Sequence, residues 1–287
     1  MADTTGMWTS LLLRIAKHWI AGENLEDALA RAQESSRQKV FGIINLLGED
    51  TTSREETEAA TAEYLEILQQ LHARKIPSCI SIKPTQLGLS IDQDMYKRNL
   101  EAILNKAKSL GNYVWVDMEQ HQYTSATVDS YLEFRKRFDN IGVAIQAYLR
   151  RSEEDVTRIL DSKGMIRLCK GAYNESPTIV YKDRRRINEN YSKLMGTMFE
   201  RGRGFAVATH DEKLIREAIG LSNLHHADFE FEMLMGIRDR KKQELVAQGY
   251  RVSEYIPHGK SWWSYSKRRI TEHKSNILLL ARSLISS

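Results

Sequence analysis

Short apolar segments alternate with longer helical stretches from residue 40 to the end of the chain, and this alternation constrains the fold most strongly. Eight segments predict strands: residues 40–46, 78–82, 113–116, 142–147, 166–169, 205–208, 228–231 and 251–256. The stretches after them predict helices: residues 53–74, 95–110, 125–138, 152–160, 184–200, 211–221, 234–248 and a last helix after Gly259. Alternating strands and helices are typical of parallel βαβ units, and eight such units predict a closed (βα)8 barrel.

The chain shows no low-complexity segment, linker or change in composition, so we predict a single domain over residues 1–287. Residues 39–287 form the barrel, and residues 1–38 form an N-terminal helical extension with helices at 7–21 and 24–34. These helices could cover the bottom of the barrel, touch a membrane or form a dimer. An open doubly wound sheet is the alternative fold, because a strand count from sequence is easily wrong by one.

Charge and cysteine content exclude several classes of protein. The chain has 42 Lys and Arg against 38 Asp and Glu, a net charge of +4, with the two signs interspersed. This mild bias favours small anions or an anionic membrane surface, whereas nucleic-acid binding would require a basic block. Cys79 and Cys169 have no CxxC spacing, which indicates buried free thiols in a reducing compartment. Without a signal peptide or a membrane span, we expect a cytoplasmic protein, with peripheral contact at the inner face of the membrane left open.

Polar residues follow or end seven of the predicted strands. A single polar residue at the end of a strand is common. Polar residues at the ends of seven strands indicate a functional site, because burying charge without a partner is costly. In a barrel of this kind the reactive groups come from the C-terminal ends of the strands. The residues are Lys83, Asp117, Glu119, Gln146, Arg167, Lys170, Thr209, His210, Asp211, Glu232 and Tyr255.

The helix predicted after Gly259 carries two stripes. Helical spacing places Tyr265, Arg269 and Glu272 on one stripe with Arg268 at its edge, and places Trp263, Ile270 and Ile277 on an apolar stripe. Two adjacent guanidinium groups suit a carboxylate, which each can bind bidentately. A solvated amphipathic helix is the plainer interpretation, but Arg before Glu is the less favourable order for a pair four residues apart. After the eighth strand, this helix is expected to lie over the barrel mouth, with Trp263 packed down.

The chemistry of this site stays open on the residues alone. Metal binding is disfavoured because the chain has no HExxH or clustered ligand set, and nucleophilic hydrolysis is disfavoured because it has no GxSxG. Lys170 or Lys83 could form a Schiff base, as in a lyase or aldolase. The set of cations and tyrosines also suits an anionic cofactor with a small carboxylate substrate. A barrel that binds an anion without turnover is the non-enzymatic alternative.

Several motifs together resemble the proline dehydrogenase family, over residues 40–287. They are LCKGAY at 168–173, ATHD at 208–211, FEFEML at 229–234, VAIQAY at 143–148, YIPHG at 255–259 and the RRxxE of Arg268, Arg269 and Glu272. The resemblance implies a distorted (βα)8 TIM-like barrel that binds FAD. It implies oxidation of L-proline to Δ1-pyrroline-5-carboxylate, the first step of proline catabolism, with electrons passed to a membrane quinone.

The resemblance also implies roles for individual residues. Arg268 and Arg269 would hold the proline carboxylate, and the pyrrolidine ring would lie among Tyr173, Tyr255, Tyr265 and Leu234. Arg167 resembles the arginine beside the hydride-accepting nitrogen of the flavin, and Lys83 and Asp117 match polar residues near the isoalloxazine and the substrate. The remaining flavin-binding residues would be Gln146, Lys170, Gly171, Ala172, Thr209, His210 and Glu272. No residue is assigned as the base that deprotonates the substrate amine.

Overall fold

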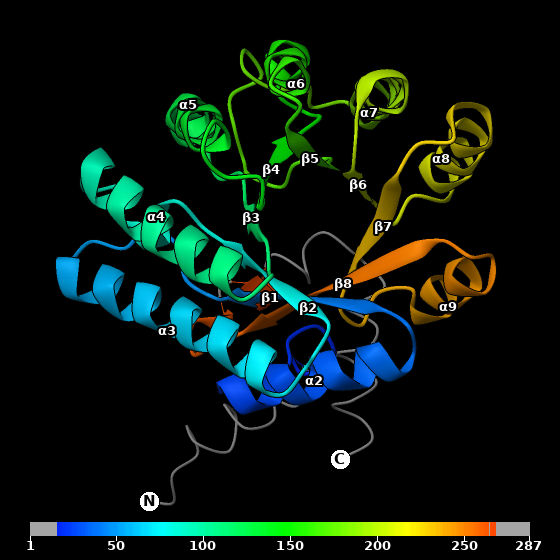
Figure 1. Cartoon of the computed structure of the whole chain (residues 1–287). Helices are drawn as coiled ribbons and strands as arrows, with labels where there is room; N and C mark the ends of the chain where they lie inside the picture. The colour runs from blue at the N-terminus through cyan, green and yellow to red at the C-terminus, as the bar shows by residue number, and fades with distance from the viewer. Residues whose placement is uncertain (1–15, 264, 268–287) are drawn as a thin grey trace, which may run out of the picture.

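Eight parallel strands form a closed barrel in the computed structural model, which describes residues 16–263 and 265–267. Each strand pairs with the next in sequence, and β8 pairs with β1 to close the ring (Figure 1). The strands are β1 Phe41–Leu46, β2 Ser78–Ile82, β3 Val114–Val116, β4 Ile141–Gln146, β5 Met165–Cys169, β6 Phe205–Ala208, β7 Phe229–Leu234 and β8 Arg251–His258. The predicted closed barrel is therefore confirmed, and the open sheet is excluded.

Helices surround this barrel (Figure 1). They are α2 Leu25–Arg37, α3 Arg54–Ala73, α4 Gln93–Ser109, α5 His121–Arg135, α6 Ser152–Asp161, α7 Arg184–Arg201, α8 Glu212–His225 and α9 Asp239–Ala247, with a short 3-10 helix at Thr85–Leu87. Acceptor side chains fix where several of them begin. Ser53 accepts from the amide of Glu56 and Asp92 from that of Met95, which satisfies amides that have no partner inside the helix.

Side-chain alternation along the strands separates two apolar regions. In β5, Ile166 and Leu168 belong to the large core between strands and helices. Arg167, between them in sequence, therefore points to the opposite side, into the barrel. A smaller apolar cluster of Ile43, Cys79, Trp115 and Ala206 fills part of that interior. The polar groups at the C-terminal ends of the strands therefore lie next to a packed apolar cluster inside the barrel.

The N-terminal helix α2 packs across the closure of the barrel, against β1 and β8 (Figure 1). The carboxylate of Glu254 in β8 joins the two: it accepts from Arg31 Nε at 2.7 Å, from Arg31 Nη2 at 2.8 Å and from Ser35 Oγ at 2.9 Å. Lys242 of α9 donates to the same carboxylate. Since Glu254 is only 1 % exposed, these partners replace the water molecules that its carboxylate loses on folding.

Residues 16–23 lie against the segment that follows β8. Trp19, Trp262 and Tyr265 share one buried cluster, and Trp19 Nε1 donates to Ser266 Oγ at 2.9 Å. The prediction that Trp263 packs down is wrong, because its side chain is 53 % exposed and the neighbouring Trp262 is buried instead. The N-terminal segment supplies the apolar partners that decide which tryptophan is buried, and helical periodicity alone cannot show them.

The helix predicted at 234–248 begins five residues later, at Asp239. Leu234 is the last residue of β7, and the chain then turns through Gly236 and Arg238, whose φ angles are +69° and +55°. Such left-handed backbone ends regular structure and cannot be read from hydrophobic spacing. Of the predicted helix 7–21, the structure describes only the end, where Trp19 and Ile20 donate to the carbonyl of Ala16. Among the described residues, no helix combines the length and the apolar character needed to span a bilayer.

Candidate active site

The carboxylate of Asp117 is the centre of a hydrogen-bonded network that joins four strands. Its Oδ1 accepts from Ser81 Oγ at 2.6 Å and from Arg167 Nη1 at 2.9 Å. Its Oδ2 accepts from Tyr255 OH at 2.6 Å and from Lys83 Nζ at 3.2 Å. The donors come from the end of β2, from β5 and from β8, so the parallel strands bring Tyr255 to Asp117 across 138 positions of sequence.

Charge complementarity fixes the ionisation of this network. Burial alone would raise the pKa of Asp117, but the cations Lys83 and Arg167 lower it below its usual value. Burial alone would lower the pKa of Lys83, but Tyr255, Asp117 and other oxygens around it raise it well above the ordinary value. Burial and the neighbouring Asp117 raise the pKa of Tyr255. At neutral pH the site therefore holds one carboxylate between two cations, with a neutral phenol.

The guanidinium of Arg167 is buried inside the barrel and held on three sides. Its carbon lies 4.5 Å from the ring centre of Trp115 and 5.7 Å from that of Tyr255. Its Nε is 2.5 Å from Glu232 Oε2. Within the described part of the chain, its buried Nη2 has no hydrogen-bond partner. A buried guanidinium group that retains a donor is suited to an anionic or polar ligand.

A loop residue and a tyrosine extend the network. Glu49 follows β1 and lies 3.4 Å from Lys83 Nζ, and it accepts from Tyr173 OH at 3.3 Å. Tyr173, at the end of the KGAY motif, is thereby linked to Lys83 through one carboxylate. The sequence predicts both Tyr173 and Lys83 near the substrate, and the structure places them on this shared partner.

A second polar group lies beyond β5 and β6. Lys170 Nζ donates to Asp211 Oδ2 at 2.8 Å, and Asn188 of α7 donates to the same oxygen at 3.3 Å. His210 Nε2 accepts from the amide of Leu234 at 3.0 Å, and the carbonyl of His210 accepts from Arg238. These contacts join the loop after β6 to the loop after β5, to α7, and to the end of β7 and the turn that follows it. They fix the rim of the barrel where the sequence predicts cofactor binding.

Several features of this rim fit a flavin dinucleotide. Gln146 donates its Nε2 to the carbonyl of Met118 at 3.0 Å, while its buried Oε1 has no partner among the residues described. Gly171 has φ +102°, and a Cβ at this position would overlap the ring of Tyr148. The ring of Tyr148 accounts for the glycine at position 171, whereas buried polar atoms without a partner among the described residues, such as Gln146 Oε1 and Arg167 Nη2, are typical of a ligand site. The residue types predicted for FAD therefore suit it here.

The other predicted site residues lie as follows. Thr209 Oγ1 accepts from the amide of Asp211, and Ala172 is exposed in the loop after β5. Tyr265 is buried against Trp19 and Leu47, at the mouth side of β1. The predicted residues Arg268, Arg269 and Glu272 lie outside the described residues, as does most of the last helix that we expect over the mouth.

Sequence reasoning gave no site role to Glu49, Ser81 or Trp115, and it placed Glu232 among the polar strand ends without a specific role. Ser81 and Trp115 lie within strands and resemble ordinary interior residues, and Glu49 lies in a loop without periodicity. Glu232 carried a signal: a charged residue within the apolar segment FEFEML must either find a partner or shift its pKa. The strand alternation that places Arg167 inside the barrel does the same for Glu232.

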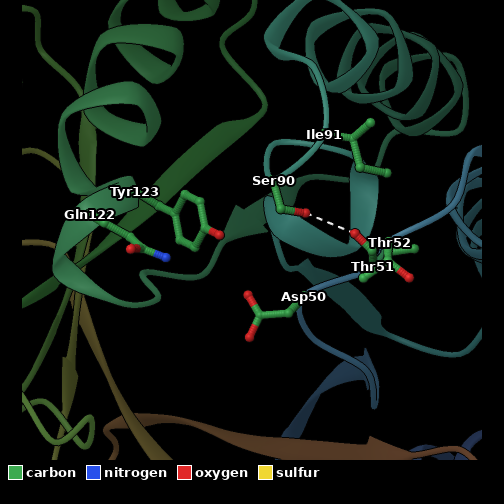
Figure 2. A pocket seen from close by; sticks show the side chains of 7 residues that line it. All are labelled: Asp50, Thr51, Thr52, Ser90, Ile91, Gln122 and Tyr123. Atoms are coloured by element: carbon green, nitrogen blue, oxygen red, sulfur yellow. Dashed lines mark hydrogen bonds between the residues drawn. The ribbon is translucent and has the colours of Figure 1, made fainter.

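A separate cleft of about 520 Å³ opens between the loops after β1 and β2 and the first turn of α5 (Figure 2). Figure 2 shows Asp50 below Ser90 on the side toward Tyr123, with Ser90 donating to the carbonyl of Thr51. The lining, Asp50, Thr51, Thr52, Ser90, Ile91, Gln122 and Tyr123, contains one carboxylate and no cation. This cleft does not suit an anionic cofactor or a carboxylate substrate, so we place neither there.

The fold and the cation-rich network define a (βα)8-barrel protein with a buried site at the C-terminal ends of its strands. The sequence model of the proline dehydrogenase family matches residues 28–281. Proline dehydrogenase 1 of Bacillus subtilis strain 168 is 32 % identical over 273 residues, covering 94 % of this chain and 90 % of the relative. Proline dehydrogenase of Deinococcus radiodurans is 32 % identical over 279 residues, with the same coverage. The chain belongs to the proline dehydrogenase family.

A solved structure supports the same fold. Proline utilization A from Bdellovibrio bacteriovorus, inactivated by N-propargylglycine, superposes with a TM-score of 0.87 at 24 % identity. The match covers 92 % of this chain and 33 % of that protein, so this chain spans about a third of the larger protein.

Proposed function

We propose that this protein is a flavin-dependent proline dehydrogenase. It oxidises L-proline to Δ1-pyrroline-5-carboxylate, the first step of proline catabolism, and passes the electrons to a quinone-type acceptor. The observation that carries this proposal is Arg167: a buried cation held between Asp117 and Glu232, with a donor that has no partner among the described residues. Membership of the proline dehydrogenase family supports the same reaction.

The proposed cofactor is FAD, which when bound would supply the acceptor for the hydride from the carbon beside the ring nitrogen. Arg167 would stabilise the negative charge that this transfer creates, and its fixed position means that little reorganisation is needed. Gln146 would offer its side-chain carbonyl oxygen, which no other described residue contacts through a hydrogen bond, and Lys170 and His210 link the loops of the rim. The full proposed set is Gln146, Arg167, Lys170, Gly171, Ala172, Thr209, His210 and Glu272.

The proposed substrate site combines two arginines with a wall of aromatic rings. Arg268 and Arg269 would bind the carboxylate, since two guanidinium groups bind it better than isolated cations do. Tyr255 would line the ring of the substrate, and its hydroxyl is held by Asp117 at 2.6 Å. Lys83, Tyr173, Tyr265 and Leu234 complete the proposed set. A substrate fixed in this way gains most of its rate from orientation.

The Schiff-base alternative is less well supported than the redox reaction. A lysine must lose its proton to attack a carbonyl group. Burial alone would lower the pKa of Lys83, but Tyr255 and Asp117 raise it well above the ordinary value, so its ammonium group persists. Lys170 donates to Asp211 and helps to fix the loop. Neither lysine is arranged as a nucleophile.

We also propose a single-domain enzyme in the cytoplasm, with peripheral contact at the membrane where a quinone would accept the electrons. The packing of residues 16–23 and α2 against β8 and the segment after it supports one folding unit.

Product formation tests the proposed reaction. Protein supplied with FAD and a soluble artificial electron acceptor should convert L-proline to a product that forms a coloured adduct with o-aminobenzaldehyde. D-proline should react far more slowly, because its carboxylate cannot meet the clamp while the same carbon faces the flavin. A protein that is trapped by borohydride on a substrate carbonyl, and forms no such adduct from proline, would favour the lyase.

A further inference from the structure

Glu232 is a buried ionisable group that the proposed mechanism does not use. It lies in β7, is 3 % exposed, and places its Oε2 at 2.5 Å from Arg167 Nε. Its second oxygen, Oε1, is buried and has no hydrogen-bond partner within the described residues. The neighbouring carboxyl of Glu230 differs, because it accepts from Ser253 Oγ at 2.6 Å. Glu232 thus has one oxygen on the cation and one oxygen available for a proton.

The proton on Glu232 decides the charge around Arg167. Asp117 is held ionised by Lys83 and Arg167, although its burial opposes this. When Glu232 is also ionised, Arg167 lies between two carboxylates and the three groups carry a net negative charge. When Glu232 is protonated, the three groups are neutral. The other titratable groups that interact electrostatically with Glu232 are Cys79 of β2, Tyr113 just before β3, Cys169 of β5, Glu230 of β7 and Tyr191 of α7.

We propose that Glu232 is a positioning residue that binds a proton when the flavin beside Arg167 is reduced, and releases it when the flavin is reoxidised. This inference rests on the proposed function. A negative charge gained by the flavin attracts the Arg167 guanidinium and repels an ionised Glu232. The neutral carboxylic acid is then favoured, so electron transfer and proton binding are coupled.

The exchange balances over the catalytic cycle. Oxidation of zwitterionic proline removes a hydride from carbon and a proton from nitrogen. The hydride would carry both electrons to a bound flavin, and above about pH 8, where Glu232 is ionised in the oxidised protein, Glu232 would hold the proton. A quinone-class acceptor requires two electrons and two protons. A bound flavin would supply the electron pair with one proton, and Glu232 would supply the other proton.

The range of pH where this coupling is visible follows from the environment of Glu232. Burial raises the pKa of Glu232 to about 8, although Arg167 opposes the rise. Below this pKa the carboxyl is already protonated in the oxidised protein, so reduction adds no proton there. Above it, the oxidised protein has an ionised Glu232 that reduction protonates. The coupling is therefore expected above about pH 8 and not below.

The potential of the bound flavin, measured from pH 7 to 10, tests the inference. Above about pH 8 the wild-type potential should fall more steeply than that of Glu232→Gln, by about 30 mV per pH unit, since a tenfold change in a two-electron equilibrium is 29.6 mV. Below that pH the two slopes should agree. Glutamine keeps the shape and an acceptor for Arg167 but cannot titrate.

Glu119→Gln is the matched control. Burial raises the pKa of Glu119 to about 7, but Thr85 holds both of its oxygens and it does not contact Arg167. The additional slope should persist in this variant. If the additional slope of the potential persists in Glu232→Gln, or disappears only in Glu119→Gln, the inference is overturned while the proposed function stands.

A second measurement does not depend on the folding of a variant. Reduction of the wild-type flavin in weakly buffered solution at pH 9 should take up about two protons per electron pair rather than about one, by the same linkage. Uptake of one proton would contradict the role of Glu232. A protein that binds no FAD would instead contradict the proposed function, and the inference with it.

Discussion

Replacing Arg167 by methionine is expected to lower kcat/KM for proline by about 10²–10³-fold, the usual loss when one fixed charge-stabilising group is removed. Methionine keeps much of the volume but cannot stabilise the charge that develops on the flavin. It also leaves Asp117 and Glu232 without the cation between them. Steady-state kinetics with FAD in excess, together with a thermal melt, separate a loss of rate from a loss of folded protein.

Arg185→Met is the control for a lost arginine. Its side chain is 86 % exposed, at the start of α7, and pairs with Glu189 on the same helix. Its kinetics should match those of the wild type. Arg167→Lys should recover part of the rate, because lysine restores the positive charge but not the planar guanidinium group that donates several hydrogen bonds. Wild-type kinetics in folded Arg167→Met would remove Arg167 from the catalytic site.

Glu254→Ala is expected to lower the free energy of unfolding by about 3–5 kcal/mol, as breaking a buried ion pair generally does. The substitution leaves Lys242 buried and removes the carboxylate that joins Arg31 of α2 to β8. Burial alone would raise the pKa of Glu254, but Arg31 and Lys242 lower it. Its contribution is therefore present above the pKa of an unfolded glutamate and is lost as the pH falls through the lower, folded-state pKa. Urea denaturation measures the change.

Glu189→Ala is the matched control, because it removes an exposed carboxylate whose arginine partner is also exposed. It should change stability by about 0.5 kcal/mol or less. A Glu254→Ala variant that unfolds at the wild-type urea concentration would show that α2 does not depend on this carboxylate.

The barrel was predictable from local patterns. Each predicted strand overlaps an observed one, since apolar β-branched segments between helical stretches leave few alternatives. The residues at which strands end and helices begin were less predictable. β7 runs on to Leu234 and α9 begins only at Asp239, because Gly236 and Arg238 adopt left-handed backbone that apolar spacing does not reveal.

The site was predictable as far as strand ends determine it. Lys83, Asp117, Arg167 and Tyr255 were expected at one end of the barrel, and the structure joins all four through one carboxylate. Their roles stay a prediction. What the sequence could not show were contacts made across the barrel between distant positions, such as Glu49 with Tyr173.

The orientation of the segment after β8 depends on residues far away in sequence. Helical spacing placed Trp263 inward and Tyr265 on a polar stripe. In the structure Trp262 and Tyr265 pack against Trp19, and Trp263 is exposed. The packing partner that orients this segment, Trp19, lies more than 240 positions earlier in the sequence. A hydrogen bond from Trp262 Nε1 to Glu23, 239 positions earlier, holds the same segment. Residues from 268 onward, including the proposed clamp, keep their predicted roles as proposals.

The absorbance spectrum of the purified protein, recorded without oxygen before and after adding L-proline, tests the central claim most directly. We expect a yellow protein whose flavin band bleaches on addition of L-proline and returns when a quinone analogue is added. An FAD-loaded protein whose band stays unchanged with proline, while dithionite bleaches it, would contradict the account.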